Sequence, residues 1–277
     1  MSSSSRPARV LAYSRVAMSL MDFGISSAGV FGSQHDADTG AGVGSGPVSV
    51  GAGGSVSLDA VRSLAPDLIV SVLYRDDALY GVPPEIAAEF EAMAPTVGLR
   101  VGAGRTLTEP LSRFADLALA LGARADSPDL QQGRSSLDEA AHSVRLALEE
   151  RAGLRILALS AEQERVHLAN PLGWPDLRYF SELGVGLLRL PVAEDASWQT
   201  VLWDDVAEIP ADLVLVDSRS VSLRMAQLAA HPVWEILPAV QAGQVGSWNP
   251  EAPLSYQVSA RIVSDLAIQL GGTTRLT

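Results

Sequence analysis

Arginine and aromatic residues follow several predicted strands of this 277-residue chain. Open α/β sheets bind ligands beyond the carboxyl ends of their strands, so these positions are the first candidates for a site. Guanidinium groups donate paired hydrogen bonds to oxyanions, and aromatic rings form rigid apolar walls. At each position the alternative is a solvated arginine or a tryptophan packed in the core. The predicted ligand-binding residues are Tyr74, Arg75, Arg105, Trp174, Tyr179, Arg219 and Trp248.

No pattern typical of catalysis or of a protein-bound metal accompanies these residues. The chain contains no cysteine and no lysine, which excludes thiolate chemistry, iron–sulfur clusters and lysine Schiff bases. Its four histidines lack the spacing of a metal site, no GxSxG occurs, and Ser218 beside Asp217 has no obvious histidine partner. We therefore predict that the protein is not an enzyme and binds no metal ion directly. The alternative is an enzyme built on a two-lobed scaffold.

Two series of alternating strands and helices must position these side chains, which indicates parallel sheets. The glycine-rich stretch at residues 40–54 is predicted to be a plain loop, since it fits no phosphate-binding pattern. The predicted strands are 9–13, 68–73, 96–99, 154–159, about 165–168, 212–216 and 245–248. The main predicted helices are 16–23, 57–64 with Ser57 as its N-cap, 84–93, 111–121, one starting at Tyr179, 233–242 and 255–270.

One predicted helix differs from the others in length. Apolar residues recur at helical spacing from Ser127 to Arg151, and about 25 residues would extend roughly 37 Å. We therefore predict two Rossmann-like α/β lobes joined by one long bridging helix, with a ligand cleft between the lobes. The predicted boundaries are residues 1–126 for the first lobe, 127–152 for the bridging helix and 153–277 for the second lobe.

Composition narrows the function classes. Hydrophobic residues make up 47% and charged residues 19%, as in a folded globular chain. The net charge of -12 argues against a nucleic-acid partner, which usually requires a basic surface. The sequence contains no apolar run long enough for a membrane helix, and its first residues lack the apolar segment of an export leader.

Short stretches along most of the chain resemble the substrate-binding proteins of iron–siderophore and cobalamin ABC importers. Each stretch alone is common, but their order and spacing around the long helix are specific. The resemblance extends from about Arg9 to Leu270. The stretches that carry it are Leu64–Val70, Ala94–Val97, Leu119–Gly122, Glu182–Gly184, Ala211–Val216, His231–Trp234, Pro238–Val240, Gly243–Val245 and Pro253–Tyr256.

This resemblance implies a binding protein that captures a ferric siderophore and delivers it to an ABC importer permease. Iron would enter only as part of the bound complex, so no cofactor is expected, and we expect a monomer. Family members often carry a glutamate on each lobe to dock onto the permease, and Asp59 and Asp205 lie near the equivalent places. Solvated acids at helix starts are the alternative.

Several alternatives stay open at this point. Haem or cobalamin could replace the siderophore, with Tyr74, Tyr179 or Tyr256 as a haem ligand. The resemblance implies an extracytoplasmic location in the cell envelope. Because no leader or lipid-anchor cysteine is present, a cytosolic siderophore-binding or sensing protein of the same fold is the other possibility. The class of siderophore, hydroxamate or catecholate, is not predicted.

Overall fold

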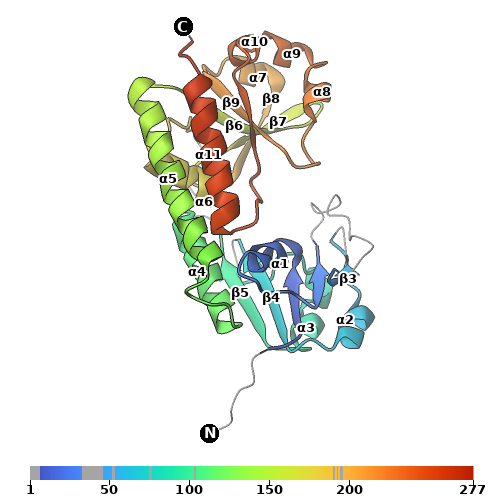
Figure 1. The fold of residues 1–277 in the computed structure, drawn as a ribbon. Coiled ribbons are helices and arrows are strands. Elements are labelled where there is room, and N and C mark those ends of the chain that lie inside the picture. Colours follow the sequence, from blue (N-terminus) through green and yellow to red (C-terminus); the bar gives the residue numbers. More distant parts are fainter. Residues whose placement is uncertain are drawn as a thin grey trace. The chain divides into compact units, whose positions relative to one another are not determined.

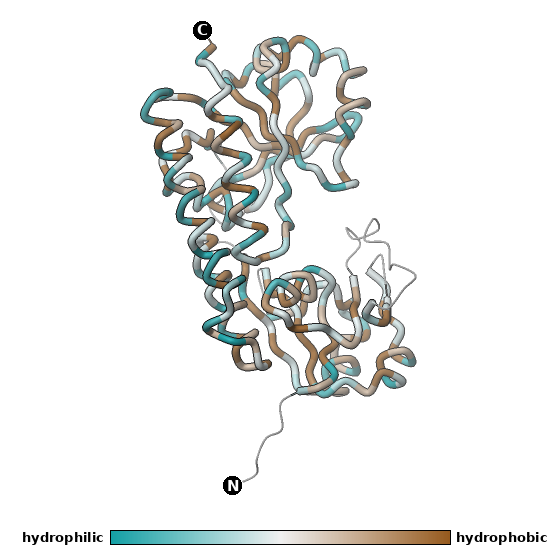
Figure 2. Tube along the Cα trace, in the orientation of Figure 1, coloured by the Kyte–Doolittle hydropathy of each residue, from teal (hydrophilic) through white to brown (hydrophobic). Residues whose placement is uncertain are grey.

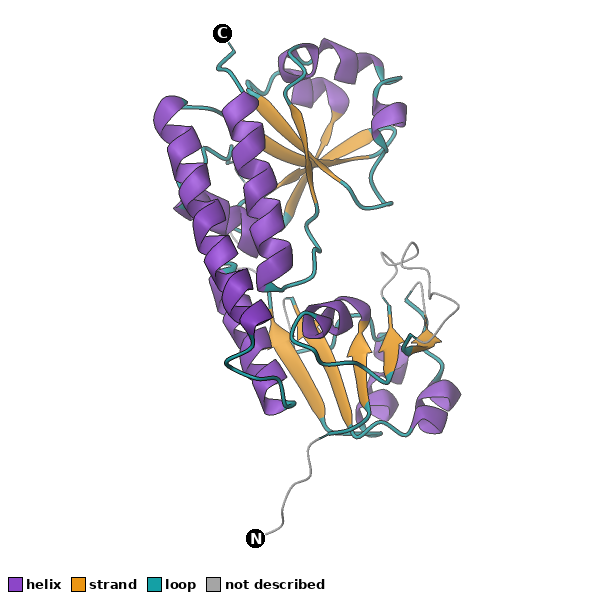
Figure 3. Ribbon diagram, viewed as in Figure 1, coloured by secondary structure: helices purple, strands orange, loops and turns teal. Residues whose placement is uncertain are grey.

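A computed structural model describes residues 7–32, 46–51, 54–74, 77–102, 104–189, 191, 193 and 196–276 (Figure 1). The chain divides into two compact units. The N-terminal unit comprises Met1–Val101, Glu109–Gly133 and Ala252–Val258, and the C-terminal unit comprises Gly102–Thr108, Arg134–Glu251 and Ser259–Thr277. Figure 3 shows that each unit contains a sheet flanked by helices. None of the described helices has the length and apolarity needed to cross a membrane.

The N-terminal unit is built on a parallel sheet with strand order β3-β2-β1-β4-β5. Strand β4, which lies inside the sheet between β1 and β5, is buried at every position, which explains why its sequence is a continuous apolar run. The strands are β1 (Val10–Tyr13), β2 (Gly29–Phe31), β3 (Val48–Gly51), β4 (Leu68–Leu73) and β5 (Thr96–Arg100). The helices are α1 (Ser14–Met21), α2 (Leu58–Leu64), the 3-10 turn Pro84–Ile86, α3 (Ala87–Glu91) and α4 (Thr108–Ala120).

The sheet of the C-terminal unit has the order β10-β9-β6-β7-β8 and is mixed. Strands β10, β9 and β6 are parallel, whereas β7 is antiparallel to both of its neighbours. The prediction of a wholly parallel sheet is therefore wrong here. Only residues 162–164 connect β6 to β7, and a parallel crossover needs a dozen or more. The strands are β6 (Ile156–Ala161), β7 (Arg165–Ala169), β8 (Trp198–Leu202), β9 (Leu213–Asp217) and β10 (Val245–Trp248).

Two long helices each begin in the N-terminal unit and continue in the C-terminal unit. They are α5 (Pro128–Glu150) and α11 (Tyr256–Gly272), and α5 is the predicted bridging helix. A side chain at Gly133 of α5 would lie 3.1 Å from Cβ of Tyr256 on α11, so glycine permits this close approach. The other helices of the C-terminal unit are α6 (Pro175–Glu182), α7 (Trp203–Ala207), α8 (Met225–Leu228), α9 (Pro232–Ile236) and α10 (Pro238–Gln241).

Each unit has its own hydrophobic core. The core of the N-terminal unit joins β1 and β4 to α1 and to Phe90 of α3. The core of the C-terminal unit joins β6 and β9 to Trp203, Trp234 and Leu237. The central strands are correspondingly apolar in Figure 2. The predicted N-cap is also confirmed, because the Ser57 hydroxyl accepts a hydrogen bond from the Ala60 backbone N–H at 3.3 Å.

Three local predictions are wrong. The helix predicted at 233–242 is two helices, because Pro238 keeps Leu237 extended with φ -62° and ψ 128°. The stretch predicted as a loop at residues 40–54 contains β3, although much of it lies outside the described residues. Helix α6 begins at Pro175, four residues before the predicted start, because proline fits the first helical position.

Candidate functional site

Three tryptophan rings meet in the C-terminal unit. We refer to Trp174, Trp198 and Trp248 as the indole cluster. The ring centroids of Trp174 lie 5.1 Å from Trp198 and 5.6 Å from Trp248, and those of Trp198 and Trp248 are 5.7 Å apart. Trp174 and Trp248 are buried, whereas Trp198 is half-exposed. The cluster therefore presents one accessible ring, supported from behind by two others.

Distant parts of the sequence supply these three rings. Trp248 ends β10 and Trp198 begins β8, which are the two edge strands of the sheet. Trp174 directly precedes α6, and its indole N–H donates to the carbonyl of Ser197 at 2.9 Å. This bond ties the start of α6 to the residue before Trp198, so the loop before β8 fixes the position of the exposed ring.

A buried arginine lies beside the exposed ring. The guanidinium carbon of Arg219 is 5.9 Å from the centroid of the Trp198 ring, within the range of a cation–π contact. The same guanidinium donates to Asp217 at the end of β9 and to Glu251, each at 2.8 Å. The two carboxylates hold the cation over the ring of Trp198.

A carboxylate positions the buried ring of Trp248. Its indole N–H donates to Oδ2 of Asp176 at 2.5 Å, and the backbone N–H of Leu177 donates to Oδ1 at 2.9 Å. Burial raises the pKa of the Asp176 carboxyl to about 6, although both hydrogen bonds favour its ionised form and act in the opposite direction. Asp176 thus titrates in the range of mild acid.

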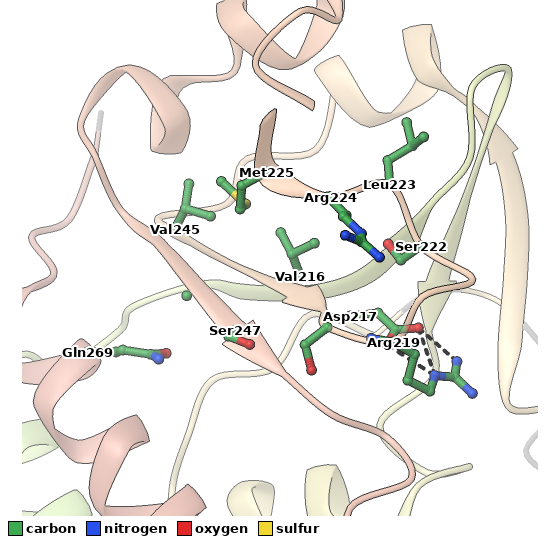
Figure 4. Close-up of a pocket in the computed structure, with 12 residues that line it drawn as sticks. Val216, Asp217, Arg219, Ser222, Leu223, Arg224, Met225, Val245, Ser247 and Gln269 are labelled. Atoms are coloured by element: carbon green, nitrogen blue, oxygen red, sulfur yellow. Dashed lines mark hydrogen bonds and ion pairs between the residues drawn. The ribbon is translucent and has the colours of Figure 1, made fainter. Parts of the chain in front are cut away.

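A pocket of about 450 Å³ lies within the C-terminal unit, where the segment after β9 faces the edge strand β10 (Figure 4). Figure 4 shows Val216, Met225 and Val245 around its apolar part and Arg219 at one end. Its volume lies within the range of small-molecule pockets, and its lining combines apolar side chains with polar and charged ones. The other lining residues are Asp217, Ser218, Ser222, Leu223, Arg224, Gly246, Ser247 and Gln269.

In the N-terminal unit, three tyrosines pack edge to face near the ends of the strands. The ring of Tyr80 lies 4.7 Å from Tyr74 and 5.4 Å from Tyr13. Tyr13 ends β1 and is buried, whereas Tyr74, which follows β4, is half-buried. Of the predicted residues in this part of the sequence, Tyr74 therefore lies at a strand end as expected, and Arg75 lies outside the described residues.

The remaining predicted residues do not join the indole cluster. Tyr179 is buried, and desolvation raises the pKa of its phenol, with Arg145 and Asp138 of α5 among its charged neighbours. Arg105 is half-buried in the segment between β5 and α4. The predicted docking acids are exposed at the starts of α2 and α7: Asp59 pairs with Arg62, and Asp205 accepts from the Leu202 backbone N–H at 3.1 Å.

The sequence analysis missed Trp198, Asp176 and Glu251. Trp198 lies on a half-exposed edge strand whose pattern is weak, so neither the strand nor its first residue was predicted. The only available signal was its identity as one of five tryptophans. Asp176 and Glu251 act through partners 72 and 32 residues away in the sequence, which no local pattern reveals.

The described residues hold no group of three or more His, Asp or Glu side chains that could bind a metal ion. His231 directly precedes α9 and stacks on Trp203 with a centroid distance of 4.1 Å. The indole cluster combines three packed aromatic rings with one oriented cation.

The model of the periplasmic binding protein family matches residues 32–252. A curated relative, the Fe(3+)-citrate-binding protein YfmC of Bacillus subtilis (strain 168), is 23% identical over 198 residues. That match covers 71% of this chain and 58% of YfmC, so the chain spans less than two thirds of the relative's length.

Two solved structures are similar over nearly their full lengths. DesE, a ferric-siderophore receptor protein from Streptomyces coelicolor, is 29% identical with a TM-score of 0.89, covering 100% of this chain and 96% of DesE. The siderophore periplasmic binding protein from the fuscachelin gene cluster of Thermobifida fusca is 20% identical with a TM-score of 0.70, covering 97% and 98% of the two chains. At 20% identity, the similarity to the Thermobifida fusca protein shows a shared fold and nothing further.

Proposed function

This chain belongs to the periplasmic binding protein family, and we propose that it binds a ferric siderophore and delivers it to the permease of an ABC importer. Members of this family are binding proteins. The similarity to a ferric-siderophore receptor supports the choice of ligand class. In this proposal iron is cargo held by the siderophore, so the protein recognises the complex without contributing a metal ligand.

The observation that carries the proposal is the half-exposed ring of Trp198 beside Arg219. A ferric siderophore presents oxygen atoms around the metal and apolar linkers between its chelating groups. The guanidinium of Arg219 suits the oxygens, and the ring of Trp198 suits the linkers. Because Trp174 and Trp248 support that ring, it can stack on a ligand without a large loss of conformational entropy.

Tryptophan fluorescence titration of the purified protein tests this proposal. We expect saturable quenching by at least one ferric complex among trihydroxamates, catecholates and citrate, and none by its iron-free form. Trp198→Ala should weaken that binding about tenfold, since an aromatic contact of this kind contributes roughly 1.5 kcal/mol. Leu202→Ala is the matched control, because Leu202 is an exposed apolar residue on the same strand, 60% accessible. Equal affinities of the two variants would contradict the assignment of Trp198.

We further propose that Asp59 and Asp205 dock the protein onto arginines of the permease. Both carboxylates are exposed in the first turn of a short helix, where the positive end of the helix favours an acid. Asp59→Asn and Asp205→Asn should preserve ligand affinity and lower iron uptake by cells that depend on this protein. Asp116→Asn, an exposed acid on α4, is the control, and full uptake by both docking variants would refute the assignment.

An extracytoplasmic location in the cell envelope is part of the same proposal, since delivery to an importer requires it. Fractionation of the native host with an antibody against the chain measures this directly. Recovery in the membrane or envelope fraction supports transport. Recovery in the cytosol would favour a binding protein that stores or senses the siderophore instead.

A further inference from the structure

Asp176 is a half-buried acid that contacts an indole ring rather than a cation. Its carboxylate accepts hydrogen bonds from the Trp248 indole N–H at 2.5 Å and the Leu177 backbone N–H at 2.9 Å, and its own backbone N–H also favours the ionised form. It occupies the first turn of the eight-residue helix α6. The function proposed above assigns it no role.

An asparagine at this position would accept the same indole hydrogen bond without placing a charge in a desolvated site. The carboxylate is therefore the less stable choice at neutral pH, as its pKa of about 6 also indicates. What a carboxylate adds is a stronger hydrogen bond, because an ionised acceptor binds a donor more tightly and in a narrower geometry. Unfavourable ionisable groups retained beside a recognition surface are typical of functional sites.

We propose that Asp176 is a positioning residue: its carboxylate fixes the ring of Trp248, and through it the ligand-facing ring of Trp198. Trp248 contacts Trp198 at 5.7 Å with 56° between the ring planes, and Trp174 at 5.6 Å with 87°. A rotation of Trp248 would therefore displace both neighbours. Loss of the Asp176 charge in mild acid loosens this arrangement and weakens ligand binding.

Other charged and titratable groups surround the indole cluster, and their effects on it must be distinguished from the effect of Asp176. One of them is His167 of β7, whose ring lies 6.4 Å from Trp198 and which contacts Thr200 and Glu162. His167→Gln removes this imidazole and leaves Asp176 in place. The remaining groups are Asp217, Arg219 and Glu251 around Trp198, and Arg178, Tyr179 and Glu182 on α6 itself.

The first experiment uses the protein without any ligand. Indole rings 5–6 Å apart give strong near-ultraviolet circular dichroism that reports their mutual orientation. We expect this signal to change between pH 8 and pH 5 with a midpoint near 6 in the wild type and in His167→Gln. The change should be absent in Asp176→Asn. The proposal is overturned if the pH-dependent change in circular dichroism persists in Asp176→Asn. It is also overturned if the change is lost only in His167→Gln.

A measurement on the wild type alone covers the case in which Asp176→Asn fails to fold. The indole ¹⁵N–H resonance of Trp248 should shift with the same midpoint. That of Trp234, which is buried in the core of the C-terminal unit, should stay constant. Equal behaviour of the two resonances overturns the proposal.

The second experiment measures affinity for a ferric trihydroxamate, which stays intact from pH 5 to pH 8, and it rests on the proposed function. Wild-type affinity should fall three- to tenfold on acidification through pH 6. Asp176→Asn should bind with the reduced affinity at every pH. If Asp176→Asn binds the ferric trihydroxamate with wild-type affinity at pH 7.5, the proposal is overturned. If the wild type binds no ferric complex at any pH, the proposed function fails, and the spectroscopic experiments still decide the role of Asp176.

Discussion

Replacing Asp176 with asparagine is expected to stabilise the protein at neutral pH. Burial raises the pKa of this carboxyl from its usual 3.8 to about 6. The folded state then binds the proton more tightly than the unfolded state, so the contribution of Asp176 to stability is full below pH 3.8 and is lost as the pH rises through 6. Each tenfold change in proton affinity corresponds to 1.36 kcal/mol, so the loss at pH 7.5 is about 3 kcal/mol.

Asparagine resembles the protonated acid, since it is neutral and still accepts the indole hydrogen bond of Trp248. By the same linkage, the variant should exceed the wild type in free energy of unfolding by up to about 3 kcal/mol at pH 7.5, and by about 1 kcal/mol at pH 4.5. Urea denaturation followed by far-ultraviolet circular dichroism measures both values. Asp116→Asn, which removes an exposed carboxylate, should change neither by more than a few tenths of a kcal/mol.

Two results would refute this reasoning. A variant less stable than the wild type at pH 7.5 would show that the charged hydrogen bond outweighs desolvation. A gain of equal size at both pH values would show that the effect does not arise from the titration of Asp176. The expected combination, in which stability rises while ligand binding becomes weaker, is the trade-off typical of residues kept for function.

Two further substitutions test other parts of the structure. Gly173→Ala places a Cβ 2.7 Å from the backbone of Ser197, so we expect about 1–3 kcal/mol of destabilisation and weaker ligand binding, measured by urea denaturation and titration. Gly271→Ala on α11 is its control, because no atom lies within 4 Å. Asp212→Asn breaks the buried pair with Arg155, and we expect about 3 kcal/mol or more of destabilisation by the same assay. Although burial opposes it, hydrogen bonding lowers the pKa of Asp212 to about 2, so the wild-type advantage should persist at neutral pH and be lost as the pH falls from 4 toward 2. If Gly173→Ala or Asp212→Asn is as stable as the wild type, the contacts described for that residue are wrong.

The predictable parts of the fold are those with a strong local signal. Strands β4 and β9 each lie between two other strands and are buried, and their continuous apolar sequences identify them. Glycines that follow helices are a second strong signal, and Gly184 and Gly243 adopt positive φ values of 99° and 69°. Strands β3 and β8 lie at sheet edges with half-exposed residues, so their sequences lack a clear alternation.

The candidate site was predictable only in outline. The rule that ligands bind at strand ends makes Trp248 and Arg219 candidates, and the long helix with its flanking motifs indicated the family. Which side chains meet is a property of the tertiary structure. The indole N–H of Trp248 bonds Asp176 across 72 residues of sequence, and the exposed ring belongs to Trp198 on an edge strand that was not predicted.

The central claim is that the C-terminal unit recognises a ferric siderophore through Trp198 and Arg219. Isothermal titration of the wild type and of Trp198→Ala with ferric trihydroxamate, ferric catecholate and ferric citrate tests it most directly. The account predicts submicromolar binding of at least one complex by the wild type, and about tenfold weaker binding of that complex by the variant. Absence of binding by the wild type, or identical affinities of the two proteins, would contradict the claim.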